Sequence, residues 1–287
     1  MKEKKKSKWW LCVAPLYFFT LLFVVGPMIY MVAVSFATNN GSGYGFFWQF
    51  TLDNYKKMWD SVYLQCFQQS FQLAFFTTII NILVGYPFGY FMAKLSKRGR
   101  QIMMFLIMIP FWTSSLLRLY GWIIILQAKG VLNAVLQALG ILEKPIKLLY
   151  SYQAVLFGMV YALLPFMILA VYNSVEKMDW SLVEAARDLG ASSVKAFFTV
   201  TFKLTLPGLM TGVIMTFVPS MGLFFIADIL GGNKIVLVGS LIQDQLSRGS
   251  NWPFAAALAV VLTLLTSLML WLYRKVTHAD VMEGGLF

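Results

Sequence analysis

Six apolar runs, each long enough to cross a membrane as a helix, constrain this chain more than any other feature. A hydrocarbon core about 30 Å thick requires roughly 20 apolar residues in a helix. Hydrophobic residues make up 59% of the chain and charged residues 12%, whereas soluble domains carry about 25% charged residues. The sequence therefore predicts an all-α integral membrane protein, a single domain over residues 1–287. The six predicted transmembrane helices cover residues 9–36, 70–93, 102–126, 154–172, 209–230 and 255–273.

The distribution of basic residues predicts the orientation of these helices. If the N-terminus is cytoplasmic, 15 Lys and Arg residues lie on the inner side and 8 on the outer side, as expected when basic residues remain inside. The polybasic residues 1–8 precede a long apolar run without a small-residue cleavage site, which favours a retained first span over a signal peptide. Both termini are then cytoplasmic, and the net charge of +11 reflects topology and not nucleic-acid binding.

Two parts of the apolar pattern are irregular. The third predicted span contains Arg118, and its outer end is a place where the helix breaks or tilts. Residues 131–142 are too few to cross a membrane, so they are predicted to form a helix at the outer surface. Helix breakers also occur inside the spans, where they permit kinks that an alternating opening could use, or serve only close packing. These breakers are Gly85, Pro87, Pro165, Gly212, Pro219 and Gly222.

Residues 174–207 are the longest soluble, helical stretch in the second half of the chain, and they lie between two predicted spans. Ser181 precedes an apolar run and Glu184 follows three residues later. In this spacing the two side chains can satisfy each other's free backbone N–H groups. The pattern predicts a helix that begins at Leu182.

A second short helix is predicted to follow a tight turn. Gly190 can adopt the left-handed conformation that ends a helix, and Ser192 or Ser193 can cap the next one. The presence of such a hairpin in a membrane protein is explained if a soluble partner binds it. The alternative is an ordinary cytoplasmic helical hairpin, because capping signals occur in many proteins.

The hairpin resembles the EAA loop of the permease subunits of bacterial ABC importers. The resemblance lies in Glu184-Ala185-Ala186, three further residues, Gly190, and a later Leu206-Pro207. It implies a type I importer permease whose cytoplasmic loop couples it to a cleft on an ATP-hydrolysing subunit. Ala185 and Ala186 would allow close approach, while Glu184, Arg187 and Asp188 would present charge to that partner. The chain departs from the family at Phe202-Lys203, where the family usually carries Leu-Pro, so a proline break is expected only at Pro207.

Three further segments resemble the polyamine permeases of this family, of the spermidine/putrescine type. They are residues 51–55 (TLDNY), 110–121 (PFWTSSLLRLYG) and 251–255 (NWPFA). This resemblance covers nearly the whole chain. It implies a bacterial inner-membrane importer with a second, PotC-like permease, two copies of a PotA-like ATPase, and a PotD-like external binding protein that delivers spermidine or putrescine.

Polyamines are flexible polycations, so their path requires aromatic faces for cation–π contacts and a few acids. Aromatic residues make up 16% of the chain. An acid within a span is expensive to bury and is a candidate functional group. Alternatively, the aromatics lie at the membrane interface, and Asp228 reaches headgroup water or pairs with Lys234 or Arg248. Arg118 is expected to extend outward or to pair with an acid. The candidate path residues are Tyr55 in a loop, Trp112, Tyr120 and Trp122 along one outer half-span, and Asp228.

Catalytic motifs are absent from the sequence. Without a glycine-rich phosphate loop, no cofactor is expected in this subunit, and ATP and Mg²⁺ are expected in the partner ATPase. His278 is the sole histidine, and the two cysteines, Cys12 and Cys66, are predicted neither to form a metal site nor to pair. The alternatives are a permease for another small solute, such as sulfate, iron or an amino-acid derivative, a self-contained secondary transporter or channel, and a membrane-embedded enzyme.

Overall fold

The structure is a computed structural model that describes residues 9–41, 45–249 and 251–277. The chain forms two compact units, residues 1–64 with 241–265 and residues 65–240 with 266–287. The residue boundaries of the two units fall within helices α4, α13 and α14. The elements that begin in the first unit are α1 (Trp9–Thr20), η1 (Leu21–Val25), α2 (Gly26–Ser35), β1 (Thr38–Asn39), β2 (Phe46–Phe47), α3 (Asp53–Lys57), α4 (Ser61–Lys94) and α14 (Trp252–Thr277).

The remaining helices begin in the second unit. They are α5 (Lys97–Met108), η2 (Ile109–Trp112), α6 (Ser115–Leu126), α7 (Val131–Ala138), α8 (Tyr152–Glu176), α9 (Ser181–Asp188), α10 (Ser193–Ala196), η3 (Phe197–Thr201), α11 (Phe202–Gly222), α12 (Phe224–Gly231) and α13 (Val238–Ser247). Among the described residues only β1 and β2 are strands, paired antiparallel as Thr38 with Phe47 and Asn39 with Phe46. The predicted all-α class is confirmed.

A short polar motif ties the end of α2 to α3 within the first unit. The buried side chain of Asn54 donates hydrogen bonds to the carbonyls of Ser35 and Ala37, at 3.0 and 2.9 Å. The Tyr55 hydroxyl lies 2.7 Å from the Ser35 hydroxyl, and its ring packs 5.2 Å from that of Phe36. These bonds satisfy carbonyls that the C-terminus of α2 leaves free.

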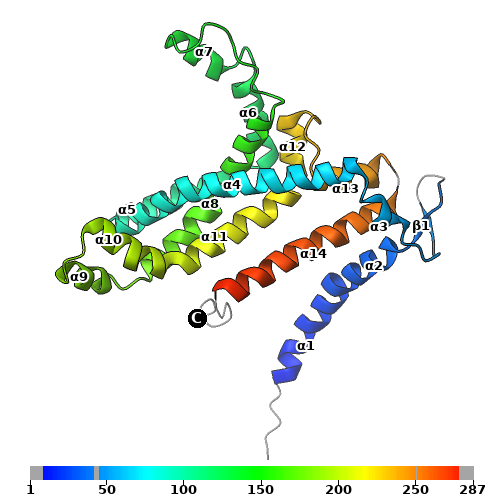
Figure 1. Cartoon of the computed structure of the whole chain (residues 1–287), viewed down its shortest axis with the longest axis horizontal. Helices are drawn as coiled ribbons and strands as arrows, with labels where there is room; N and C mark the ends of the chain where they lie inside the picture. The colour runs from blue at the N-terminus through cyan, green and yellow to red at the C-terminus, as the bar shows by residue number, and fades with distance from the viewer. Residues whose placement is uncertain (1–8, 42–44, 250, 278–287) are drawn as a thin grey trace, which may run out of the picture. The chain divides into compact units, whose positions relative to one another are not determined.

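One buried cluster of the second unit lies where α4, α8 and α11 meet (Figure 1). Met167 is fully buried in it. A Cβ added at Gly85 on α4 would lie 2.7 Å from Met167, and one added at Gly212 on α11 would lie 2.5 Å from it. Two of the predicted helix breakers therefore let neighbouring helices approach closely, as small residues do in membrane bundles. Helix α4 continues through Pro87, α8 through Pro165, and α11 through Pro207 and Pro219.

Six helices in the described part of the chain are long and apolar enough to cross a membrane, as predicted. The third of them differs from its prediction, because the apolar run 102–126 is broken at Thr113 and Ser114 between η2 and α6. Thr113 has an extended backbone that interrupts the helix, while the hydropathy continues across it. The six candidate spans are Val13–Ser35, Ser61–Lys94, Ser115–Ala138, Tyr152–Glu176, Ser193–Gly222 and Trp252–Tyr273.

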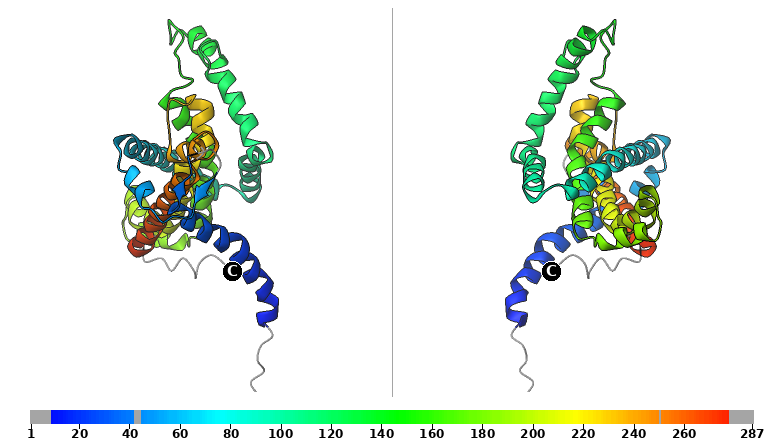
Figure 2. Two further views of the ribbon diagram at one scale, coloured as in Figure 1. Left: turned by 90° about the vertical axis from the view of Figure 1, so that its right-hand side faces the viewer. Right: turned by 90° about the vertical axis from the view of Figure 1, so that its left-hand side faces the viewer.

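The fifth predicted span is also divided. Helix α11 ends at Gly222, Leu223 departs from helical geometry, and α12 continues from Phe224. A helix is present where one was predicted over residues 131–142, as α7, which projects from α6 (Figure 2), and the third candidate span extends from α6 through it. Asn133 holds α7 in place, because its side-chain amide donates to the carbonyls of Gln127 and Ile146 and accepts from the Ile146 N–H.

Candidate functional site

A helical hairpin connects α8 to α11, and it is shorter than residues 174–207. Ser174 lies inside α8, and the second helix of the hairpin, α10, runs through the π-helical turn η3 directly into α11. The proline break expected at Pro207 is therefore wrong, because that proline lies within α11, as membrane helices often allow. Residues outside the two long helices are confined to 177–192.

The N-terminus of α9 is held by Asp179. Ser181 is the first residue of the helix, so its side chain does not cap it, and the predicted capping box is wrong. Instead, the Oδ1 atom of Asp179 accepts a hydrogen bond from the Ser181 N–H at 3.0 Å. A carboxylate is the better partner here, because the N-terminus of a helix attracts negative charge. Hydrogen bonds from the Ser181 side chain and backbone lower the pKa of Asp179.

The cap at Asp179 gives a pH-dependent prediction. Because its pKa is lowered on folding, its stabilising effect is present above the ordinary value of 3.8 and is lost as the pH falls through the lower folded value. Asp179→Ala is expected to make the amides of α9 exchange hydrogen several-fold faster at pH 7, whereas Asp179→Asn, which keeps the acceptor oxygen, is expected to preserve protection. Equal exchange in both variants at pH 7 would contradict the cap.

The C-terminus of α9 ends in a Schellman motif centred on Gly190. Gly190 has a φ of +85°, in the left-handed region predicted for it. Its N–H donates to the Arg187 carbonyl at 2.9 Å, and the Ala191 N–H donates to the Ala186 carbonyl at 3.0 Å. Ser192 then caps α10, because its hydroxyl accepts from the Lys195 N–H at 3.3 Å. The predicted turn and second cap are confirmed.

The tip of the hairpin exposes apolar side chains. Leu189 is 89% exposed, and Val194 and Phe198 on the following turns are also exposed. Glu184, Arg187 and Asp188 lie exposed on α9 beside them. An exposed apolar cluster with a polar rim is typical of a surface that binds another protein. Leu189 was not among the residues predicted from the sequence, although its place just before the left-handed glycine was a signal.

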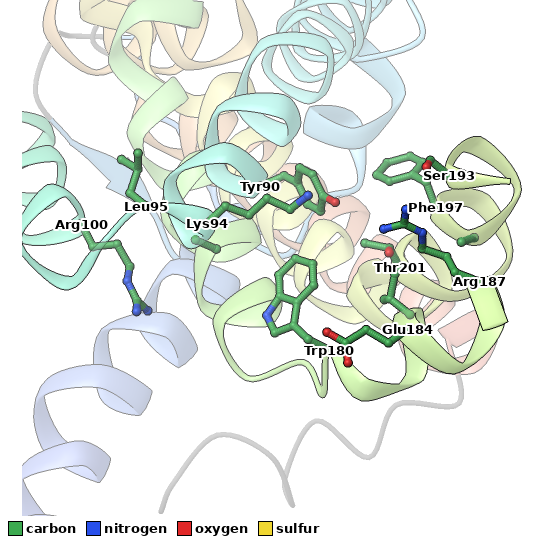
Figure 3. A pocket seen from close by; sticks show the side chains of 13 residues that line it. Tyr90, Lys94, Leu95, Arg100, Trp180, Glu184, Arg187, Ser193, Phe197 and Thr201 are labelled. Carbon is green, nitrogen blue, oxygen red and sulfur yellow. The ribbon is translucent and has the colours of Figure 1, made fainter. Parts of the chain in front are cut away.

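A surface pocket of about 610 Å³ lies between the hairpin and the end of α4 (Figure 3). The Lys94 ammonium group lies 4.3 Å from the centre of the Tyr90 ring and 5.3 Å from that of Trp180. Cation–π contacts of this kind hold the last residue of α4 against the start of α9. Glu184 and Arg187 line the same pocket from α9. The predicted loop residues thus adjoin Lys94 and Trp180, which sequence spacing did not connect.

An ion pair also joins α5 to the inner end of α8. The Nη1 atom of Arg100 lies 2.8 Å from Oε1 of Glu176, with both side chains partly exposed. Glu184, Arg187 and Asp188 line a second pocket, of about 440 Å³, together with residues 191–193. The contacts of Lys94 with Trp180 and of Arg100 with Glu176 therefore hold the base of the hairpin, while Leu189 at its tip is exposed.

The four aromatic path residues lie on different elements of the chain. Tyr55 lies in the first unit, where its hydroxyl meets Ser35. Trp112 lies in η2, before the break, is 72% exposed and contacts the ring of Phe105 edge-on at 5.5 Å. Tyr120 and Trp122 are two residues apart on α6, so they point to different sides of the helix. The expectation of one aromatic half-span is wrong, because the helix breaks after Trp112.

Trp122 and Arg118 both pack on Tyr161 of α8. The rings of Trp122 and Tyr161 lie 5.4 Å apart, and the Arg118 guanidinium carbon lies 5.7 Å from the centre of the Tyr161 ring. Trp122 also meets Phe157 at 4.5 Å. Arg118 therefore stacks on an aromatic ring instead of pairing with an acid. Tyr161 was not among the residues chosen from the sequence.

Asp228 lies half-buried on α12. Its Oδ1 atom accepts a hydrogen bond from the Ser240 hydroxyl at 2.8 Å. Lys234 and Arg248 were the basic residues expected to pair with Asp228. Arg248 instead forms an ion pair with Asp244, at 3.6 Å. Within the described residues Asp228 has no ion pair, so its carboxylate has acceptor positions available for a cation.

Cys66 is a buried free thiol.

Six helices apolar enough to cross a membrane, with an exposed helical hairpin between two of them, are the features expected of a membrane transport permease. The family described as "Binding-protein-dependent transport system inner membrane component" matches residues 85–278. The chain belongs to that family, as the sequence analysis predicted.

Proteins that are similar over almost the full length of this chain support the family assignment. The chain is 42% identical to the spermidine/putrescine transport system permease protein PotB of Haemophilus influenzae, over 92% of both chains. It is 41% identical to PotB of Escherichia coli, over 90% of this chain and 94% of the relative. A chain of the solved bacterial alginate ABC transporter shares the fold, with a TM-score of 0.74 and 14% identity over 97% of each chain.

Proposed function

We propose that this chain is a permease subunit of an ATP-driven importer that moves spermidine and putrescine into the bacterial cytoplasm. The observation that carries the proposal is the α9–α10 hairpin, a soluble structure with an exposed leucine at its tip, set between two helices apolar enough to cross a membrane. Identity above 40% to two spermidine/putrescine permeases supports the substrate class.

The proposed assembly supplies what this chain lacks. Two PotA-like subunits bind ATP and Mg²⁺ and hydrolyse the ATP, a PotC-like permease forms the other half of the path, and a PotD-like protein delivers the polyamine from outside. Glu184, Ala185, Ala186, Arg187, Asp188 and Gly190 form the coupling site of this subunit. The excess of basic residues around the hairpin side supports a cytoplasmic location for it, with both termini inside a bacterial inner membrane.

The test is ATP hydrolysis by the assembled complex in lipid vesicles, with the external binding protein present and spermidine added or withheld. Hydrolysis is expected to rise when spermidine is added, because the loaded binding protein favours the state in which the two ATPase subunits close. A complex that hydrolyses ATP but responds equally with and without spermidine or putrescine would contradict the substrate assignment and leave the importer architecture standing.

Asp228 is the proposed acidic contact of the path, together with Tyr55, Trp112, Tyr120 and Trp122. Asp228→Asn is expected to lower polyamine uptake about tenfold, because a hydrogen bond to a charged group contributes about 1.5 kcal/mol or more. ATP hydrolysis is expected to fall less. Asp244→Asn is the matched control, since Asp244 already pairs with Arg248. Equal uptake by the two variants at all spermidine concentrations would remove Asp228 from the path.

A further inference from the structure

Ser240 lies in the first turn of α13, and its hydroxyl group bonds to a different helix. The side chain is buried. Its hydroxyl donates a hydrogen bond to Oδ1 of Asp228 on α12, at 2.8 Å. Several other buried hydroxyl groups donate to a carbonyl of their own helix, as those of Thr78, Thr216 and Ser220 do. The bond of Ser240 instead joins two helices and ends on a carboxylate.

The start of α13 is anchored to α4. The backbone N–H of Val238, the first residue of α13, donates to the hydroxyl oxygen of Ser70 at 2.8 Å. The first N–H groups of a helix have no partner within that helix, so this bond satisfies a group that would otherwise stay unpaired. Ser70 is fully buried, and its own hydroxyl donates to the Cys66 carbonyl at 2.9 Å. The position of Ser240, two residues after Val238, is thereby fixed relative to Ser70.

Close backbone contacts hold the same segment against the break between α11 and α12. A Cβ added at Gly239 would lie 2.8 Å from the Gly222 carbonyl oxygen and 3.1 Å from Cβ of Phe224. Only a residue without a side chain allows α13 to approach the break this closely. At the other end of α12, the Leu230 carbonyl accepts a hydrogen bond from the Tyr150 N–H at 2.9 Å. Both ends of α12 are thus fixed by contacts with other segments.

The Asp228 carboxylate has one oxygen without a partner. The side chain is partly exposed, and its Oδ2 atom makes no hydrogen bond or ion pair with any residue that the structure describes. A serine hydroxyl is a neutral donor, so it orients the carboxylate and leaves its negative charge uncompensated. A lysine or arginine in place of Ser240 would neutralise that charge and compete with a cationic ligand. The Asp228 carboxylate is therefore oriented and still able to bind an ammonium group.

We propose that Ser240 is a positioning residue of the polyamine path, whose hydroxyl group holds the Asp228 carboxylate with Oδ2 available to an ammonium group of the substrate. This inference rests on the proposed function and adds a residue that acts through Asp228 without touching the polyamine. When the hydroxyl is removed, the aspartate side chain rotates more freely, and ordering it again costs part of the binding free energy. Ser240 therefore matters to transport only while residue 228 carries a negative charge.

The experiment is a double-mutant cycle in the full complex, in vesicles with the external binding protein present. Spermidine uptake per ATP hydrolysed is compared for Ser240→Ala, Asp228→Asn and the variant with both substitutions. Ser240→Ala is expected to lower this ratio about fivefold, less than the loss of about tenfold in uptake expected for Asp228→Asn. The double variant is expected to match Asp228→Asn within about twofold, because a positioning residue has no effect once the negative charge is gone.

Ser220→Ala is the matched control, because Ser220 is also buried but its hydroxyl donates within its own helix, to the Phe217 carbonyl at 2.7 Å. It is expected to keep wild-type uptake per ATP, and an equal loss in this control would overturn the inference.

Four other results would overturn the inference and leave the importer assignment standing. They are wild-type uptake in Ser240→Ala, wild-type uptake in Asp228→Asn, losses that multiply in the double variant, and failure of Ser240→Ala to accumulate in the membrane. Multiplied losses would mean that Ser240 acts independently of Asp228, and failure to accumulate would mean that its hydroxyl serves only the fold. A wild-type complex that takes up no polyamine would overturn both the inference and the proposed function.

Discussion

Gly190→Val is expected to abolish uptake while the protein still inserts into the membrane. Gly190 has a φ of +85°, and a side chain in the left-handed region costs about 1–2 kcal/mol, more for a branched one. Nothing lies within 4 Å of an added Cβ, so the cost arises from the backbone alone. Loss of the Schellman motif changes the angle between α9 and α10, which sets the surface offered to the ATPase. Uptake and membrane content are the two measurements.

The chain contains a matched control for this variant. Gly140 ends α7 with a φ of +71°, has open space around its Cβ position, and takes part in the same pair of backbone bonds, from Gly140 N–H to Gln137 and from Ile141 N–H to Leu136. Gly140→Val is expected to keep most of the uptake, because α7 belongs to the outer side in the proposed topology. If both variants lose uptake equally, general misfolding explains the loss and the coupling role of Gly190 is rejected.

Leu189→Asp is expected to release the ATPase subunit. Full burial of a leucine contributes about 1.5–3 kcal/mol, and an aspartate in its place would bring a desolvated charge to the interface. Leu189 is 89% exposed in the free chain, so its gain on binding is near the upper end of that range. We expect affinity for the ATPase to fall about 100-fold or more. Retention of the ATPase during purification in mild detergent measures the effect.

Leu139 provides the corresponding control. It also precedes a left-handed glycine and is 67% exposed, but it lies at the end of α7. Leu139→Asp is expected to retain the ATPase as the wild type does. Normal copurification of the ATPase with Leu189→Asp would show that the hairpin tip is not the apolar anchor, and the charged residues Glu184, Arg187 and Asp188 would then carry the binding.

Much of the hairpin was predictable because its signals are local. A glycine six residues after Glu184 predicts a left-handed helix end, and a serine two residues later predicts the next cap, whatever surrounds them. The start of α9 was predicted wrongly because two local acceptors compete there. Asp179 and Ser181 both suit a cap, and the carboxylate of Asp179 begins the helix one residue before the predicted position.

The candidate path was predictable only as a list of residue types. Hydropathy is continuous across Thr113, so a window of about 20 apolar residues cannot reveal the break that separates Trp112 from Tyr120. Likewise, nothing in the sequence near Arg118 indicates that Tyr161, far along the chain, provides its aromatic partner. Long-range contacts of this kind decide which of the candidate aromatics share a surface.

The sequence by itself determined the class of this protein, the number of its apolar spans, the helical hairpin and the family, because hydropathy acts within one helix of about 20 residues and capping chemistry within one or two helical turns. Only the tertiary structure decided that Lys94 lies against both Tyr90 and Trp180, and that Arg118 lies over the ring of Tyr161. The reason is physical. The partners of such side chains are set by which helices pack side by side, and local sequence does not specify that packing.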